Sequence, residues 1–268
     1  MDECKAVHFL RQAEPATVFV RCFVCHYLPN MDVSLLPIIA ILSAAAFLTV
    51  WFHKLTIIAA VTGVIAAMLI FMGTSYTGLV MLACFFILGT LATSFKMKQK
   101  QSLHIAENDR GKRNAAQVLA NGGVAALLGL LAWQFPQHKF LCGVMIAAGF
   151  ASATADTLSS ELGNVYGKQF YNILTLKKDT RGLNGVISLE GTLCGLAGSV
   201  LIAIIYTVGF GWGIGFGIAI IAGTIGNLFD SLMGATLERT GAIGNNTVNL
   251  LNTLVAALAG GGLFLLFG

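Results

Sequence analysis

The segment FLCGVMIAAGFASATADTLSSE, residues 140–161, is a run of small and apolar side chains that ends with two carboxylates. From Phe140 to Ala155 it carries no charged residue, and its length suits a helix that crosses the hydrocarbon core of a bilayer. An ionisable group in lipid costs several kcal/mol, so it usually faces the protein interior or a water-filled cavity. The segment therefore predicts a membrane-spanning helix that brings Asp156 and Glu161 to a polar site.

The composition of the whole chain agrees with this interpretation. Hydrophobic residues make up 56% of the chain, charged residues 10%, and the mean hydropathy is +0.80. Soluble domains carry about 25% charged residues, so we expect an all-α, polytopic integral membrane protein. About eight segments are long and apolar enough to be spans: 34–51, 55–71, 77–95, 115–135, 140–161, 186–209, 212–237 and 247–267.

Basic residues gather in two of the connecting loops. The loop 96–113 holds Lys96, Lys98, Lys100, Arg110, Lys112 and Arg113, and the loop 163–185 holds Lys168, Lys177, Lys178 and Arg181. Because short basic loops stay in the cytoplasm, both loops are predicted to be cytoplasmic, in the inner (cell) membrane if the source is prokaryotic. The net charge of +4 is therefore loop charge and does not indicate a nucleic-acid partner.

The first 33 residues lack a continuous apolar core, and we expect a disordered leader or a mis-assigned start ahead of one transmembrane domain, residues 34–268. Within this segment Cys22, Cys25 and His26 match the C-x-x-C-H pattern of covalent haem attachment. One short match, with no surrounding domain to enclose a porphyrin, is weak support for haem. An unstructured leader is the preferred interpretation.

A second stretch, GNLFDSLMGATLER at 226–239, repeats the arrangement of ATADTLSSELG at 153–163. In each, small residues precede an aspartate that is followed by leucine, further small residues and a glutamate. Both helices would run in the same direction, so Asp156 and Asp230 would lie at one depth. The pattern predicts a parallel repeat of two helical hairpins.

Amide side chains recur at helical spacing where two other spans begin. Asn114, Gln117 and Asn121 form one stripe, and Asn245, Asn249 and Asn252 form another. A single amide in a span can equally well serve to join helices. Together with the acids and the basic loops, however, the stripes predict a polar cavity that faces the cytoplasm. Carboxylate and amide oxygens in such a cavity suit Mg²⁺, which binds through one or two carboxylates plus substrate phosphates.

Several motifs carry a family resemblance. FKMKQK, RNAAQVLANGG, ATADTLSSELG, TRGLNGVISLEGTLCGLAGS, GTIGNLFDSLMGATLER and NNTVNLLNT resemble the integral-membrane family of animal transmembrane protein 19 and the plant phytyl-phosphate kinase of vitamin E synthesis. GNVYGK and KKDTRGLNG are also similar to the phytol kinase, dolichol kinase and phosphatidate cytidylyltransferase group, which uses a nucleoside triphosphate, commonly CTP.

The resemblance implies a Mg²⁺-dependent kinase that transfers a phosphoryl group from a nucleoside triphosphate to an isoprenoid (phytyl or prenyl) monophosphate, giving the diphosphate. We assign Asp156, Asp230 and Glu161 to the metal, with Glu190 as an alternative ligand. We assign the nucleotide phosphates to Lys168, Lys178 and Arg181, and the lipid phosphate to Lys96 and Arg113. The amides that would orient substrate or metal-bound water are Asn114, Asn121, Asn245 and Asn249.

Two other kinds of function fit the same features. One is a related lipid enzyme, either a nucleotidyltransferase for lipid phosphates or a kinase for the free prenol. The other is a secondary transporter, because transporters also place acids in repeated helices. A transporter's coupling site is usually near the bilayer midplane, whereas Asp156 and Asp230 are predicted nearer the cytoplasmic edge.

Overall fold

The computed structural model describes residues 35–102 and 112–268, so the leader and its C-x-x-C-H match lie outside the described residues. The chain divides into two compact units, Met1–Ala45 and Ala46–Gly268. Helix α3 (Leu35–Trp51) begins in the first unit and ends in the second. The cavity described below lies within the second unit.

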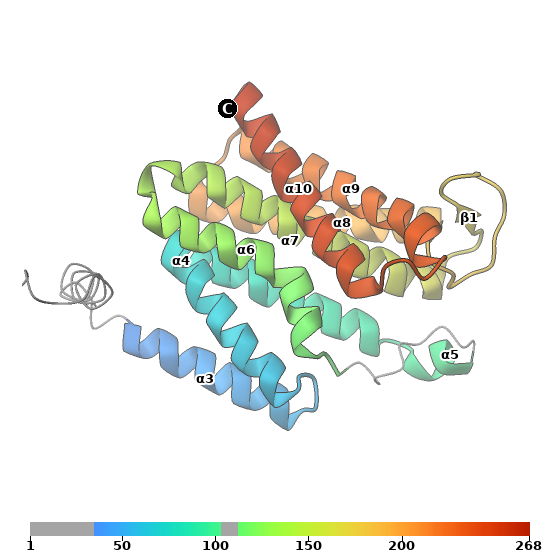
Figure 1. Cartoon of the computed structure of the whole chain (residues 1–268), viewed down its shortest axis with the longest axis horizontal. Coiled ribbons are helices and arrows are strands. Elements are labelled where there is room, and N and C mark those ends of the chain that lie inside the picture. Colours follow the sequence, from blue (N-terminus) through green and yellow to red (C-terminus); the bar gives the residue numbers. More distant parts are fainter. Residues whose placement is uncertain (1–34, 103–111) are drawn as a thin grey trace, which may run out of the picture. The chain divides into compact units, whose positions relative to one another are not determined.

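Long apolar helices dominate the second unit (Figure 1). They are α4 (Ile57–Ser94), α6 (Ala115–Gln134), α7 (Lys139–Tyr166), α8 (Leu189–Phe210), α9 (Ile214–Met233) and α10 (Asn245–Phe267), joined by the short α5 (Met97–Ser102), the 3-10 turn Pro136–His138 and the π-helical turn Gly234–Glu238. All six long helices are long and apolar enough to cross a membrane. The expected all-α polytopic membrane fold is confirmed.

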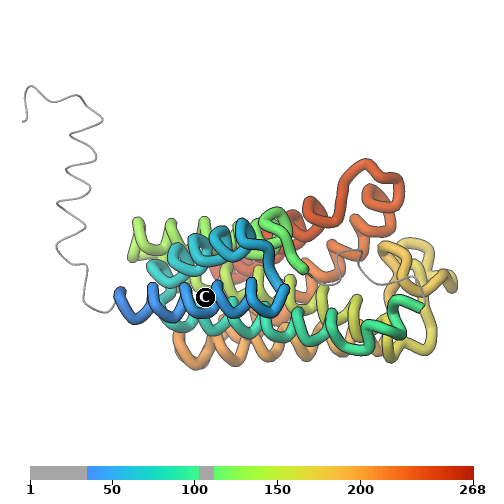
Figure 2. The backbone as a smooth tube through the Cα atoms, turned by 90° about the horizontal axis from the view of Figure 1, so that it is seen from below, coloured from blue at the N-terminus to red at the C-terminus, as the bar shows by residue number. Residues whose placement is uncertain are grey.

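Helix α4 contains two of the predicted spans, 55–71 and 77–95. Its 38 residues would extend about 57 Å if straight, but Ser75 (φ 58°, ψ −148°) interrupts the helix. Lys54, just before the helix, donates a 3.0 Å hydrogen bond from Nζ to Oγ of Ser94, its last residue. The chain therefore doubles back at Ser75, as Figures 1 and 2 show, and returns both ends of α4 to one side.

Helix α7 is the central element of the second unit, and it packs against α4, α6, α8, α9 and α10. Within its most apolar window 78% of the residues are buried, against 33–39% for the other five spans. The small residues of this helix, such as Ala147 and Ala151, let neighbouring backbones approach closely. Asp156 therefore lies on the most enclosed helix of the bundle.

The connection between α7 and α8 folds over the end of the bundle. It carries β1 (Tyr171–Asn172) and β2 (Val186–Ile187), which pair in antiparallel fashion. Gly185 has φ +73°, and a Cβ on it would lie 2.3 Å from the backbone nitrogen of Ala235. The connection thus packs directly on the π-helical turn, and Figure 1 shows it at the same end of the helices as α5.

Candidate active site

A polar cavity of about 540 Å³ opens where α4, α7 and α9 end and where α6, α8 and α10 begin. The expected convergence of polar helix ends at one depth is therefore present in the structure. Among the predicted site residues, the following line the cavity: Arg113, Asn121, Asp156, Glu161, Asp230, Asn245 and Asn249. The side of the membrane on which the cavity opens stays a prediction.

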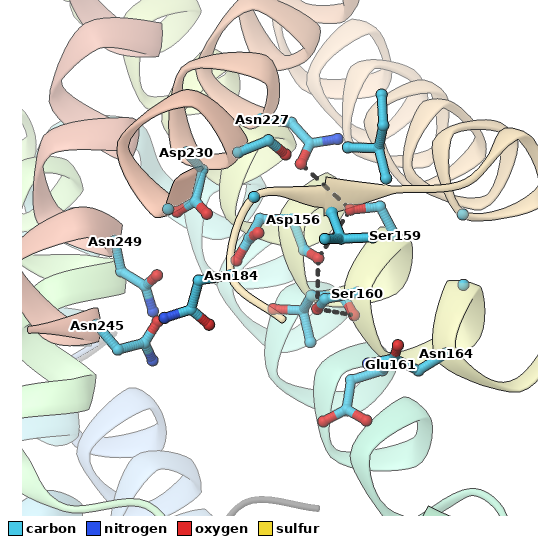
Figure 3. Close-up of a pocket in the computed structure, with 18 of the residues that line it drawn as sticks. Asp156, Ser159, Ser160, Glu161, Asn164, Asn184, Asn227, Asp230, Asn245 and Asn249 are labelled. Carbon is cyan, nitrogen blue, oxygen red and sulfur yellow. Dashed lines mark hydrogen bonds between the residues drawn. The ribbon is translucent and has the colours of Figure 1, made fainter. Parts of the chain in front are cut away.

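Asp156 and Asp230 form the centre of the cavity. Asp156 lies near the end of α7 and Asp230 near the end of α9, and their side chains point into one space (Figure 3). Nδ2 of Asn252 donates a 2.9 Å hydrogen bond to Oδ2 of Asp230. Oγ of Ser152 donates in turn to Oδ1 of Asn252 at 2.7 Å, and neither Ser152 nor Asn252 is exposed. A buried relay from α7 and α10 therefore orients Asp230.

Ser159 and Asn227 join α7 and α9 beside the two aspartates. Oγ of Ser159 donates to Oδ1 of Asn227 at 3.2 Å and to the backbone oxygen of Asp156 at 3.0 Å. The sequence analysis missed both residues, although Asn227 precedes Asp230 by three positions and so shares its helix face. Asn184 was also missed, and a loop residue offers no spacing signal that could have revealed it.

Glu161 lines the cavity but already has a cationic partner. The Lys100 ammonium group pairs with its carboxylate and also donates to the backbone oxygens of Ala92 (2.8 Å) and Thr93 (3.1 Å). Lys100 is only 1% exposed, although its sequence context suggested a loop charge. Among the described residues no three His, Cys, Asp or Glu side chains gather closely enough to hold a metal ion. The predicted set of Asp156, Asp230 and Glu161 is thus not assembled as three ligands.

Arg113 is the only lysine or arginine among the described residues that line the cavity. Its guanidinium lies 5.4 Å from the ring centre of Phe85 and 5.7 Å from that of Phe86. Its backbone is fixed to the start of α4, because its N–H donates to Lys54 and its oxygen accepts from Thr56. Four carboxylates share the described lining with this single cation: Asp156, Glu161, Asp230 and Glu238.

The other predicted cations lie outside the described lining. Lys168 and Lys178 are exposed on the α7–α8 connection, and Lys96 lies over the rings of Phe95 and Tyr166. The spacing of lysines and arginines in a loop does not define where their side chains point. The sequence therefore gave no geometric basis for assigning these three lysines to phosphate groups.

Arg181 is the exception on the α7–α8 connection. Its guanidinium lies 5.6 Å from the ring centre of Phe170, which lines the cavity. Its Nε and Nη2 atoms are buried and have no hydrogen-bond partner within residues 35–102 and 112–268. A buried, unsatisfied guanidinium is costly and suits an incoming anion.

Glu190 and Asn114 are also not among the described residues that line the cavity. Glu190 accepts a long hydrogen bond of 3.4 Å from the backbone of Lys168. The side chain of Asn114 accepts from the backbone of Gln117 at 3.0 Å, and the Gln117 side chain accepts from the backbone of Asn114 at 2.9 Å. Asn114 therefore caps α6, which accounts for this amide without a substrate.

Residues 182–188 of the α7–α8 connection form one wall of the cavity. Arg239 fixes this wall by donating from Nη2 to Oδ2 of Asp179 and from Nε to the backbone oxygen of Asn184, both at 2.8 Å. The Arg239 guanidinium holds the pKa of the Asp179 carboxyl below its usual value. In Figure 3 Asn184 lies beside Asn245 and Asn249 of α10.

Comparison with known proteins shows the family of this chain. The family of integral membrane protein DUF92 matches residues 40–257. The chain is 38% identical to an uncharacterized membrane protein of Methanocaldococcus jannaschii over 72% of this chain and 78% of that protein. It is 32% identical to the chloroplastic protein VTE6 of Arabidopsis thaliana, over 68% of this chain and 56% of that protein.

A third relative is an uncharacterized membrane protein of Synechocystis, 31% identical over 72% of this chain and 76% of that protein. No solved structure matches the chain significantly. The family match covers well over half of the chain, and the identities above 30% extend over most of it. The chain therefore belongs to the DUF92 family of integral membrane proteins.

Proposed function

We propose that this protein is a membrane-embedded, Mg²⁺-dependent kinase that transfers a phosphoryl group from a nucleoside triphosphate to an isoprenoid (phytyl or prenyl) monophosphate. The observation that carries the proposal is the facing pair Asp156 and Asp230 in a polar cavity at the end of membrane-spanning helices. The motifs resemble those of the plant phytyl-phosphate kinase, and the 32% identity to a chloroplastic plant protein agrees with that resemblance.

The donor set suits a hard divalent cation. Asp156 and Asp230 supply two carboxylates, and the carbonyl Oδ1 of Asn249 in the cavity wall is buried without a hydrogen-bond partner among the described residues. Two facing carboxylates also repel each other unless a cation or a proton lies between them. Bound Mg²⁺ would neutralise charge on the transferred phosphoryl group and on the leaving diphosphate.

The proposed reaction requires little acid–base catalysis by the protein. An oxygen of the lipid monophosphate attacks the γ-phosphorus, the bond from that phosphorus to the β-bridging oxygen breaks, and the nucleoside diphosphate leaves with the electron pair. The attacking oxygen is already ionised near neutral pH, so catalysis reduces to positioning and charge neutralisation. This fits a cavity whose described lining contains acids, amides and hydroxyls but no histidine.

We assign two arginines to the two anionic substrates. Arg113 lies beside α4 and α6, with the aromatic rings of Phe85 and Phe86 against its guanidinium. Arg181 lies on the α7–α8 connection, with its guanidinium 5.6 Å from the ring centre of Phe170. We assign the lipid phosphate to Arg113, because this residue borders the membrane-spanning helices, and the nucleotide phosphates to Arg181.

The test is an assay of the purified protein with prenyl monophosphates of several chain lengths and with ATP, CTP, GTP and UTP. We expect diphosphate formation that requires Mg²⁺ and falls at least a hundredfold in Asp156→Asn and Asp230→Asn, with thermal unfolding unchanged or raised. Thr224→Val, which alters a hydroxyl of α9 outside the cavity lining, is the matched control. The absence of diphosphate from every substrate pair would reject the proposal.

A further inference from the structure

We propose that α10 completes the metal site: Oδ1 of Asn249 binds the divalent cation directly beside Asp156 and Asp230, and Asn252 is the positioning residue that orients Asp230. The inference rests on the metal dependence in the proposed function and names the ligands. It also removes Glu161 from the ligand set.

The first support is the state of the Asn249 side chain. Its carbonyl oxygen is buried in the cavity wall and accepts no hydrogen bond from the residues that the structure describes. An unsatisfied buried acceptor is unfavourable, so a donor or a cation is expected there. The acids of the same cavity cannot donate when ionised, whereas a cation would satisfy the amide oxygen and the two aspartates together.

The second support is the direction of the α10 face. Asn249 and Asn252 are three residues apart and so share one side of the helix. The amide of Asn252 reaches Asp230 at 2.9 Å, which directs this side of α10 toward the aspartates. Figure 3 shows the Asn249 side chain facing the space into which Asp156 and Asp230 point.

The third support is the relay behind Asp230. Ser152 donates to Asn252, and Asn252 donates to Oδ2 of Asp230, so the carboxylate is fixed while its remaining lone pairs stay available. Both relay residues have 0% exposure, so water does not replace them. Groups that orient metal ligands in this manner typically change metal affinity 10–100-fold when they are removed.

Glu161 is a less favourable ligand because of its own contacts. Lys100 pairs with its carboxylate, and Lys100 is itself held by the backbone oxygens of Ala92 and Thr93 at the end of α4. Freeing Glu161 for a metal would leave a buried ammonium group without its counter-ion, which is strongly unfavourable.

The experiment is a titration of the purified full-length protein in detergent with Mn²⁺, followed by electron paramagnetic resonance, without nucleotide or lipid. We expect Mn²⁺ binding by the unaltered protein, about tenfold or more weaker binding in Asn249→Ala, and recovery in Asn249→Asp, which retains an oxygen ligand. Asn252→Ala is expected to weaken binding about 10–100-fold. Ser152→Ala removes only the outer hydrogen bond of the relay. We expect it to weaken Mn²⁺ binding less than Asn252→Ala does, while the protein stays folded.

Two controls make the result specific. Glu161→Gln should leave the Mn²⁺ affinity unchanged when it is measured below the midpoint of thermal unfolding, where the variant is still folded despite the loss of its pair with Lys100. Thr253→Val alters a buried hydroxyl of the same helix that bonds to the backbone of Ala120 and should also have no effect. Full affinity in Asn249→Ala, lost affinity in Glu161→Gln, or no Mn²⁺ binding by the unaltered protein would each overturn the inference. Diphosphate formation is measured separately, so the proposed function can survive any of these results.

Discussion

Arg239, directly after the π-helical turn, holds Asp179 of the α7–α8 connection through an ion pair of 2.8 Å. The same guanidinium donates to the backbone of Asn184, which lines the cavity. Both side chains of the pair remain 21–29% exposed, so solvent screening keeps its contribution to global stability small. Its consequence is local, because it ties one wall of the cavity to the end of α9.

Arg239→Gln should therefore loosen the α7–α8 connection without unfolding the bundle. We expect amide hydrogen exchange in residues 179–187 to rise several-fold, since these residues lose the guanidinium that links them to α9. Exchange in α7 and α10 should stay unchanged, and it serves as the internal control. Equal protection of the connection in both proteins would show that packing of Gly185 on Ala235 is sufficient to hold it.

The same ion pair predicts a pH dependence. The pKa of Asp179 is lowered in the folded protein, first by Arg239 and then by the backbone of Thr180. A lowered pKa means that the contribution of the pair is present above the unfolded value of about 3.9 and is lost as the pH falls through the folded value. After correction for intrinsic rates, exchange protection of the connection should drop only at such acidic pH, and Asp179→Asn should show no corresponding drop.

The buried pair of Lys100 and Glu161 predicts a non-additive double mutant. Lys100→Met leaves the Glu161 carboxylate without its cation, and Glu161→Gln leaves the ammonium group without its anion. Each single change is expected to destabilise the protein by about 3–5 kcal/mol, and the double variant by clearly less than their sum. Thermal and denaturant unfolding in detergent measure the cycle. Additive losses would mean that the two side chains act independently.

The sequence predicted the location of the site better than its internal contacts. Hydropathy and basic loops place helix ends at one membrane depth, so the meeting of Asp156 with Asp230 and of both with α10 could be expected. Long flexible side chains are a different matter. Lys100 is buried and Lys178 is exposed, although both belong to short basic stretches, because their contacts depend on how α5 and the α7–α8 connection fold back.

Helix spacing also could not separate capping from binding. Asn114 and Asn121 lie in one amide stripe, yet Asn114 caps α6 and Asn121 lines the cavity. The hairpin inside α4 was expected as two spans from length alone, and the positive φ of Ser75 marks where they join. The pairing of Asn252 with Asp230 could not be predicted, because it depends on the register between α9 and α10. Residue spacing within one helix does not define that register.

Gly89 predicts a variant that moves Arg113 without removing it. A Cβ at Gly89 would lie 2.6 Å from Nη2 of Arg113 and 3.5 Å from Thr157. Because the closest atom is the end of a flexible side chain, Gly89→Ala should shift the guanidinium while the fold persists. If Arg113 binds the lipid phosphate, the KM for prenyl monophosphate should rise about tenfold, with little change in the KM for nucleotide.

Gly63→Ala is the matched control for this change, since it is also in α4 and its new methyl group meets nothing within 4 Å. Both variants gain the same helix propensity, so a general effect of the alanine cancels. Equal KM values for the lipid in the two variants would show that Arg113 does not bind the acceptor phosphate.

The last prediction assigns the two arginines to the two substrates. Arg113→Gln should raise the KM for prenyl monophosphate more than that for the nucleotide, and Arg181→Gln should do the reverse, because each removes charge-assisted hydrogen bonds to a different phosphate. Loss of a hydrogen bond to a charged group costs about 1.5–3 kcal/mol, or roughly 10–150-fold in KM if the whole effect lies in binding. Lys178→Gln, which alters an exposed cation outside the described lining, is the control for loss of charge on the same connection as Arg181. The free prenol should be a poor acceptor for the unaltered protein, since a hydroxyl must lose a proton during attack, whereas we assign Asp156 and Asp230 to a metal and Glu161 pairs with Lys100, which leaves Glu238 as the remaining carboxylate of the described lining. Equal turnover of the alcohol and the monophosphate would assign the protein to the alcohol kinases. Parallel KM changes in the two arginine variants would show that both side chains contact one substrate.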